Sequence, residues 1–272
     1  MPPSRLRTVT ELVHSHPNRL QRKPMTRARR TMGFTLPVSL RSPSRRRAGA
    51  LCCGPMFRPT PALLLLSLFT SAIAWSATPD ETKCKAGKAQ SCAIAGRARI
   101  DSEEYALAKP LLEKGCKLNF AEACDDLGWI YDDGLGEDVD KVKAEQFYGK
   151  ACAGNFARGC TNQGVMYLGT DGIEKDPKKA SALFTKACDG KSWTGCKNLG
   201  LRYLTGDGVA KDEARAKKLF EEGCNNDHGP SCYDLAVMYQ NGEGMPKNKT
   251  KAKEMFSRSC ELKYDKACQY AK

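Results

Sequence analysis

The chain has 272 residues, with 44 Lys and Arg against 31 Asp and Glu, and a formal net charge of +13. Twelve of these basic residues but only one acidic residue lie in residues 1–55, and Arg58 follows, so residues 78–272 carry a net charge of about +1. The excess of basic residues therefore lies before residue 78. The nearly neutral charge of residues 78–272 excludes the nucleic-acid binding that the charge of the whole chain would suggest.

Residues 1–55 form a basic leader in which no helical or strand period is sustained, and we expect it to be disordered. Two interpretations are open. In the first, translation begins at Met56 and the leader is not part of the protein. In the second, the leader and the apolar run after it form a bipartite targeting sequence for the mitochondrial intermembrane space. Cys52 and Cys53 fall outside the cysteine period described below, and we expect no structural disulfide from them.

Residues 56–77 have the parts of a secretory signal peptide. Arg58 precedes an apolar run centred on residues 63–74, and small residues end this run before a cleavage point after Ala74 or Ala77. The run is too short for a membrane span, so we expect no stable span after cleavage. The sequence therefore predicts an exported protein, either periplasmic or secreted.

Residues 78–272 repeat with a period of 36, which is typical of an array built from one supersecondary unit. The step from Cys92 to Cys124 is 32, so the first unit lacks four residues of its internal loop. We expect about five units from Cys84 to Cys260 and a half-unit that ends the chain, all in one domain. Besides the cysteines, the residues that keep this period are Ala108, Ala144, Ala180, Ala216 and Ala252; Leu112, Tyr148, Phe184, Phe220 and Phe256; and Tyr131, Tyr167, Tyr203 and Tyr239.

Each unit holds two amphipathic helical patterns, which predicts an all-α fold. In the unit after Cys196, apolar residues recur at helical spacing over Leu199–Leu204 and again over Ala216–Phe220. Gly206 suits the exit from the first helix and Asp212 the N-cap of the second. A small residue recurs within the first helix and predicts close helix–helix approach: Gly128, Gly164, Gly200 and Ala236.

Twelve cysteines fall in pairs with seven residues between the partners. Residues eight apart in one helix are separated by about 12 Å along its axis, whereas a disulfide needs Cα atoms within roughly 4.4–6.8 Å. If the partners bond, the chain turns between them and each bridge joins the end of one unit to the start of the next. The alternative, which links Cys92 to Cys116 and so on, would join the two ends of one hairpin. The pairs by spacing are Cys84/Cys92, Cys116/Cys124, Cys152/Cys160, Cys188/Cys196, Cys224/Cys232 and Cys260/Cys268.

The repeated residues, shown most fully over Cys188–Cys232, carry a family resemblance. The pattern of Leu-Gly, Tyr, Gly-x-Gly-Val, Asp, Ala and Phe between the cysteines resembles Sel1-like (TPR-like) repeats, and the regular cysteine pair is similar to the cysteine-rich Sel1-like proteins of the Helicobacter Hcp type. The resemblance implies a right-handed α-solenoid of disulfide-stapled αα-hairpins, exported and engaged in protein–protein interaction. Some members are labelled penicillin-binding proteins or weak β-lactamases.

The motifs of known hydrolases are missing from residues 78–272. No serine there has the lysine three positions later that a serine β-lactamase uses. A metallo-β-lactamase or zinc site needs a histidine cluster, and His228 is the one histidine of this part of the chain. We therefore predict no catalytic, cofactor-binding or metal-binding residue and no cofactor.

One pair of positions on the first helix varies while the positions around it repeat. Residues four apart share a helix face, so these pairs would form a stripe along the array, which we expect on its concave side. Such variation fits either a binding face for a peptide or protein partner or drift on a solvated face. The residues are Asp126/Ile130, Asn162/Met166, Asn198/Arg202 and Asp234/Met238.

The sequence thus favours an exported, monomeric scaffold that binds a peptide or protein along its concave face and is not an enzyme. One alternative, from the resemblance, is a penicillin-binding protein or weak β-lactamase. The other, from the leader, is an assembly factor of the mitochondrial intermembrane space.

Overall fold

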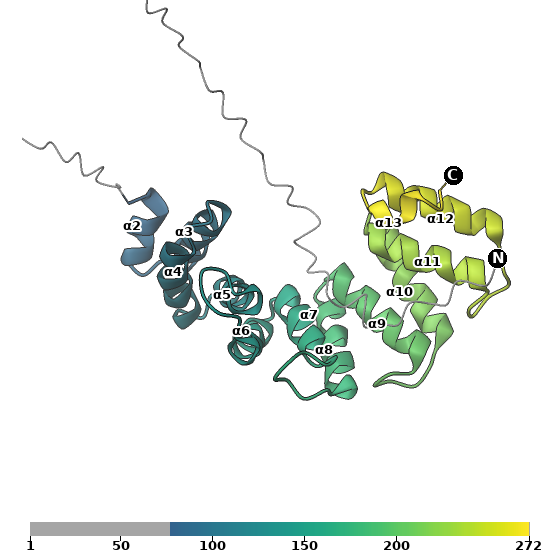
Figure 1. Ribbon diagram of the computed structural model, residues 1–272, viewed down its shortest axis with the longest axis horizontal. Helices are drawn as coiled ribbons and strands as arrows, with labels where there is room; N and C mark the ends of the chain where they lie inside the picture. Colours follow the sequence, from purple (N-terminus) through teal and green to yellow (C-terminus); the bar gives the residue numbers. More distant parts are fainter. Residues whose placement is uncertain (1–76, 272) are drawn as a thin grey trace, which may run out of the picture. The chain divides into compact units, whose positions relative to one another are not determined.

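The computed structural model describes residues 77–271. The predicted leader, with Cys52 and Cys53, and the predicted signal peptide apart from its last residue lie outside the described residues. Within 77–271 every regular element is an α-helix (Figure 1). The helices are α2 (Pro79–Lys85), α3 (Ala89–Asp101), α4 (Tyr105–Lys117), α5 (Ala121–Asp133), α6 (Lys141–Ala153), α7 (Ala157–Met166), α8 (Pro177–Asp189), α9 (Trp193–Thr205), α10 (Glu213–Asn225), α11 (Gly229–Asn241), α12 (Lys249–Glu261) and α13 (Asp265–Cys268).

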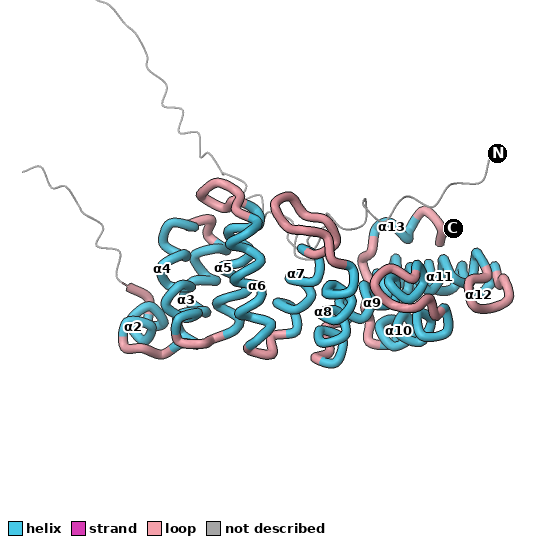
Figure 2. Tube along the Cα trace, turned by 90° about the horizontal axis from the view of Figure 1, so that it is seen from below, coloured by secondary structure: helices cyan, strands magenta, loops and turns pink. Residues whose placement is uncertain are grey.

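The helices form five αα-hairpins, α3–α4, α5–α6, α7–α8, α9–α10 and α11–α12, which follow one another side by side (Figures 1 and 2). The first helices of neighbouring hairpins also touch directly, as α3 with α5, α5 with α7, α7 with α9 and α9 with α11. The fold is therefore an all-helical solenoid in which each repeat packs on the next. The α3–α4 connection is shorter than that between α5 and α6, which confirms the predicted deletion in the first unit.

The second helix of each repeat from α6 to α12 begins at a polar N-cap, as predicted for Asp212. In each case the cap side chain accepts a hydrogen bond from the backbone N–H three residues later, which satisfies one of the donors exposed at a helix start. These N-caps are Asp140, Asp176, Asp212 and Asn248.

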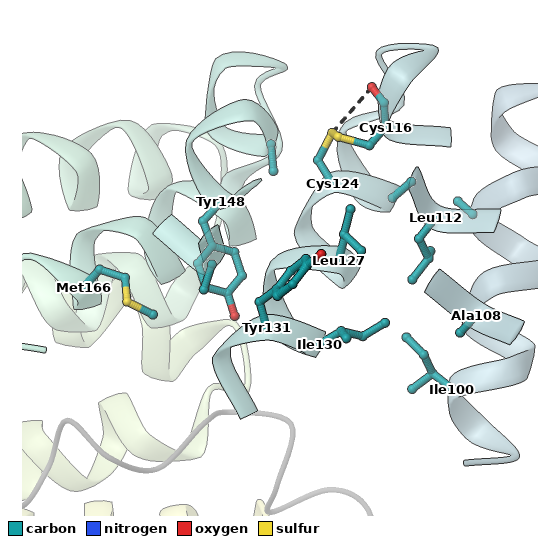
Figure 3. Close-up of a cluster of buried hydrophobic side chains, with 14 residues drawn as sticks. Ile100, Ala108, Leu112, Cys116, Cys124, Leu127, Ile130, Tyr131, Tyr148 and Met166 are labelled. Atoms are coloured by element: carbon teal, nitrogen blue, oxygen red, sulfur yellow. Dashed lines mark hydrogen bonds between the residues drawn. A yellow bond between two sulfur atoms is a disulfide. The ribbon is translucent and has the colours of Figure 1, made fainter. Parts of the chain in front are cut away.

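A glycine of the first helix lets the large residue of the second helix pack against its backbone. A Cβ placed at Gly128 would lie 2.7 Å from a ring carbon of Tyr148, and one at Gly164 would lie 2.7 Å from the ring of Phe184. Both rings are fully buried. The repeated small residue therefore serves close helix–helix approach, as predicted. Figure 3 shows the Tyr148 cluster, in which Leu127 of α5 lies between α4 and α6.

Six disulfides join the end of one repeat to the first helix of the next. Their Cα–Cα distances lie between 4.4 Å (Cys152–Cys160) and 4.8 Å (Cys260–Cys268), and every pair is separated by eight residues. The chain turns between the partners through a residue with positive φ, such as Asn155 at 60°. The pairs are Cys84–Cys92, Cys116–Cys124, Cys152–Cys160, Cys188–Cys196, Cys224–Cys232 and Cys260–Cys268. Structural disulfides in this number are typical of an oxidising compartment.

None of the helices between residues 77 and 271 combines the length and the apolar character that a bilayer-crossing helix requires.

Candidate partner-binding groove

The predicted stripe does not form a solvent-facing surface. Six of its eight residues are buried, and the other two, Asn198 and Asp234, are half-buried. The expectation of an exposed face is therefore wrong for Asp126, Ile130, Asn162, Met166, Arg202 and Met238.

The cause is the direct contact between first helices of neighbouring repeats, which covers the positions that the stripe occupies. Ile130 and Met166 belong to one buried apolar cluster, and Met238 belongs to another. Two of the polar members, Asp126 and Asn162, take part in hydrogen bonds between helices. Asn162 Nδ2 of α7, for example, donates to Asp125 Oδ1 of α5 over 3.0 Å.

Two arginines connect three successive first helices at this surface. Arg97 of α3 donates to Asp126 of α5 from Nε (2.6 Å to Oδ2) and from Nη2. Arg158 of α7 donates from Nη2 to Asp126 Oδ1 (2.8 Å) and from Nε to Asp125 Oδ2 (2.5 Å). The aspartate side chains are 2–3% exposed, whereas the arginine side chains are 29–30% exposed. Two buried carboxylates thus hold two guanidinium groups that still reach the surface.

Burial also shifts the ionisation of this network. It raises the pKa of the Asp125 carboxyl above its ordinary value, although the Arg158 guanidinium opposes that shift. Burial disfavours the charged form of Arg158 as well, but the carboxylates of Asp125 and Asp126 outweigh this and raise the pKa of Arg158. The aspartates therefore favour the charged form of Arg158, and the hydrogen bonds of the network link the three helices.

A groove of about 490 Å³ lies beside this network. Its apolar lining includes Ile94, which is 48% exposed, and Phe156, whose ring centroid lies 5.1 Å from the guanidinium carbon of Arg158. Such a mixture of exposed apolar surface and oriented charged groups is typical of a site for a protein side chain. The groove residues are Ala93, Ile94, Arg97, Ala98, Asp101, Glu122, Asp126, Phe156 and Arg158.

Ile94, Phe156 and both arginines of the groove were not predicted from the sequence. The predicted stripe takes in one pair of variable positions on the first helix, whereas Arg158 occupies another position. The residues at the position of Arg158 in the other repeats are Glu122, Thr194 and Pro230, so variation at this position was a signal in the sequence.

The one serine–histidine contact of the described residues is closed to a substrate. His228 Nδ1 lies 2.8 Å from Ser231 Oγ, and burial lowers the pKa of His228 to about 4, with Lys197 adding to this effect. Ser231 is fully buried, so this contact fixes the start of α11 and offers no accessible nucleophile. Nor do residues 77–271 contain a group of three or more His, Cys, Asp or Glu placed to hold a metal ion.

Comparison with protein families finds the Sel1 repeat four times in succession, over residues 121–156, 158–192, 194–228 and 229–264. These segments coincide with the four hairpins from α5 to α12, and the hairpin with the shortened loop precedes them. A comparison with curated proteins finds no match.

Two solved structures share the fold, and a third is similar over part of this chain. A Sel1 repeat protein from Oxalobacter formigenes is 24% identical, with a TM-score of 0.65, and the match covers 71% of this chain and 77% of that chain. A protective antigen of uropathogenic Escherichia coli with an SLR fold is 22% identical, with a TM-score of 0.64, over 71% of this chain and 42% of that chain. The cysteine rich protein B of Helicobacter pylori is 31% identical over 47% of this chain and 91% of its own, with a TM-score of 0.38.

Proposed function

Because this chain belongs to the Sel1 repeat family, we propose that it is an exported, non-enzymatic scaffold that binds a protein or peptide partner on the surface of its first helices. Repeat arrays of this kind present extended surfaces to their ligands. The six disulfides support export to an oxidising compartment, periplasmic or extracellular, because such bridges persist there. A signal peptide over residues 56–77 would provide the route.

The observation that carries the proposal is the groove between α3, α5 and α7. Ile94 is nearly half exposed at its edge, and an exposed aliphatic side chain beside partly exposed arginines is suited to an apolar anchor of a partner. The ion pairs from Arg97 and Arg158 to buried aspartates keep these groups oriented before a partner arrives, which lowers the entropy cost of binding. Two residues of the predicted stripe, Asp126 and Asn162, then serve this surface by joining the helices that form it.

The test is capture of a partner from the exported fraction of the host by the immobilised, oxidised protein. The variant Ile94→Glu places a charge where the apolar anchor would sit, and its matched control is Leu107→Glu, because Leu107 is 41% exposed on α4, outside the groove. We expect one partner to be retained by the wild-type protein and by Leu107→Glu and lost with Ile94→Glu. Equal capture by all three proteins would contradict a role for the groove.

A further inference from the structure

The disulfide between Cys260 and Cys268, which we call the C-terminal bridge, is the most accessible of the six. Both of its cysteines are half-buried, whereas every other bridge contains at least one buried cysteine. In the Cys188–Cys196 bridge, for example, Cys188 is half-buried but Cys196 is fully buried. Among the six bridges, solvent therefore reaches both cysteines of the C-terminal bridge alone.

Access to both cysteines matters because thiol–disulfide exchange makes a demand on each sulfur. An attacking thiolate bonds to one sulfur of the disulfide, and the other sulfur leaves as a thiolate. Burial of the first sulfur blocks the attack. Burial of the second makes its negative charge unfavourable, because water does not solvate it. Each of the other five bridges meets one of these obstacles, and the C-terminal bridge meets neither.

The C-terminal bridge also ties the short helix α13 to α12, against which it packs (Figure 1). α13 has four residues, far fewer than the roughly 12–15 that an isolated helix needs to be stable in water. Its other attachments are few. Ala267 is fully buried, the ring of Tyr264 lies 5.4 Å from that of Tyr233, and the ring of Tyr270 lies 4.9 Å from that of Phe256. The position of α13 therefore depends on the bridge.

We propose that the C-terminal bridge is a site of thiol–disulfide exchange with a protein dithiol, and that its reduction releases α13 from α12. One thiolate of the dithiol bonds to Cys260 Sγ, the bond between Cys260 and Cys268 breaks, and Cys268 leaves as a thiolate that takes a proton from water. The second thiolate of the dithiol then attacks the first sulfur of the same dithiol, so that Cys260 leaves in turn and is protonated. The bridge gains two electrons, and the dithiol is oxidised to a disulfide. Exchange needs no scaffold partner, so this site does not depend on the proposed function.

Release of α13 would uncover an apolar face of α12. Ala252 and Phe256 are each 4% exposed, and both belong to one cluster with Ala236 of α11 and Ala267 of α13. Without the bridge, the few contacts of α13 have to offset the entropy cost of ordering the segment, which is roughly 1–2 kcal/mol per residue for the backbone. We therefore expect α13 to detach in the reduced protein, while α12 stays packed on α11.

Reduced thioredoxin, a protein dithiol, is the probe for the exchange. The full oxidised protein is treated with it without denaturant, free thiols are blocked with N-ethylmaleimide at successive times, and peptide mass spectrometry follows each cysteine. We expect Cys260 and Cys268 to be labelled about tenfold or more faster than the cysteines of the other bridges, because those bridges have to open locally first. The proposal is overturned if all bridges are reduced at one rate, if another bridge is reduced first, or if thioredoxin reduces none of them.

Hydrogen exchange measured by mass spectrometry tests the release of α13. In the Cys260→Ala/Cys268→Ala variant, we expect residues 262–271 to exchange about tenfold or more faster than in the wild-type protein, while α12 keeps its protection. The matched control is Cys224→Ala/Cys232→Ala, which removes a bridge whose cysteines are both buried and should leave residues 262–271 protected. Thermal unfolding checks that both variants fold. Unchanged exchange over residues 262–271 in the first variant would overturn the proposal, because α13 would then stay packed without its bridge.

Discussion

Asn162 Nδ2 donates a hydrogen bond of 3.0 Å to Asp125 Oδ1, which lies 37 residues earlier, one repeat and one residue back along the chain. One repeat further along, the residues equivalent to Asn162 and Asp125 are Asn198 and Thr161. Two repeats further along, they are Asp234 and Lys197. Asp234 and Lys197 attract each other electrostatically. At two of these three places, adjacent first helices are thus linked by different chemistry: a hydrogen bond joins α5 and α7, and an electrostatic attraction acts between α9 and α11.

At the first of these junctions, Arg158→Met should destabilise the protein strongly. The substitution leaves the buried Asp125 carboxylate without its cation, and breaking a buried pair on one side costs about 3 kcal/mol or more. Arg215→Met is the control, because the Arg215 side chain is 67% exposed and water screens its pairing with Asp212. Urea unfolding at pH 7 measures both. Equal effects of the two substitutions would show that the network contributes no more than a surface ion pair.

The sequence was sufficient to predict the helical repeat because its signals are local and recur. Asp212 caps α10 and the glycine at position 164 faces Phe184, and both follow from residue type and period. The partner-binding surface was harder to predict because burial of the first helices depends on how closely neighbouring repeats approach. Asp126 is polar and variable in sequence, which resembles a solvated residue, yet it is buried by Arg97 and Arg158 from two other repeats. Periodicity alone does not report which arginine reaches which aspartate.

Gly164→Ala should destabilise the α7–α8 repeat although alanine favours helices. The added Cβ would lie 2.7 Å from the ring of Phe184, which is fully buried, so the ring or the helix would have to shift. Overpacking of this kind costs roughly 1–3 kcal/mol, more than the helix propensity that alanine gains. Thermal unfolding of the variant is the measurement. The double variant Gly164→Ala/Phe184→Leu, which shortens the opposing side chain, should recover part of the loss, and an unchanged melting temperature for Gly164→Ala alone would contradict the packing argument.

Removal of the Cys188–Cys196 disulfide by a double Cys→Ala substitution should cost roughly 2–3 kcal/mol, since the bridge closes a loop of about nine residues in the unfolded chain. The effect should be seen first at the α8–α9 boundary, because each repeat contacts only its neighbours. Hydrogen exchange measured by mass spectrometry resolves that boundary, and peptide mapping without reductant shows whether the other five bridges keep their pairing. Uniform exchange changes over all repeats would contradict a local effect.

The Asp234 carboxyl should make the protein less stable as the pH rises from about 4 to 6. Burial raises its pKa from 3.8 to about 6, against the opposing charges of Lys197 and Lys266. Below pH 3.8 the carboxyl is protonated in both states. Between 3.8 and about 6 the folded protein keeps a proton that the unfolded chain has lost, so the free energy of unfolding falls as the pH rises. A rise of the pKa from 3.8 to about 6 corresponds to a loss of about 3 kcal/mol in the free energy of unfolding. This figure is an upper limit, because Asp234 is half-buried and water screens part of the electrostatic effect.

His228 acts in the opposite direction over nearly the same range, so the pH dependence of the wild-type protein does not isolate Asp234. Burial lowers the pKa of His228 from 6.5 to about 4, and its stabilising contribution is lost as the pH falls through that window. The measurement is therefore the difference between Asp234→Asn and wild type in urea unfolding at pH 4, 5, 6 and 7. Asp234→Asn should be more stable at pH 7, with the gain shrinking towards pH 4, whereas Asp189→Asn, an exposed control, should show no such change. A gain that is constant with pH would mean that the Asp234 carboxyl titrates alike in the folded and unfolded states.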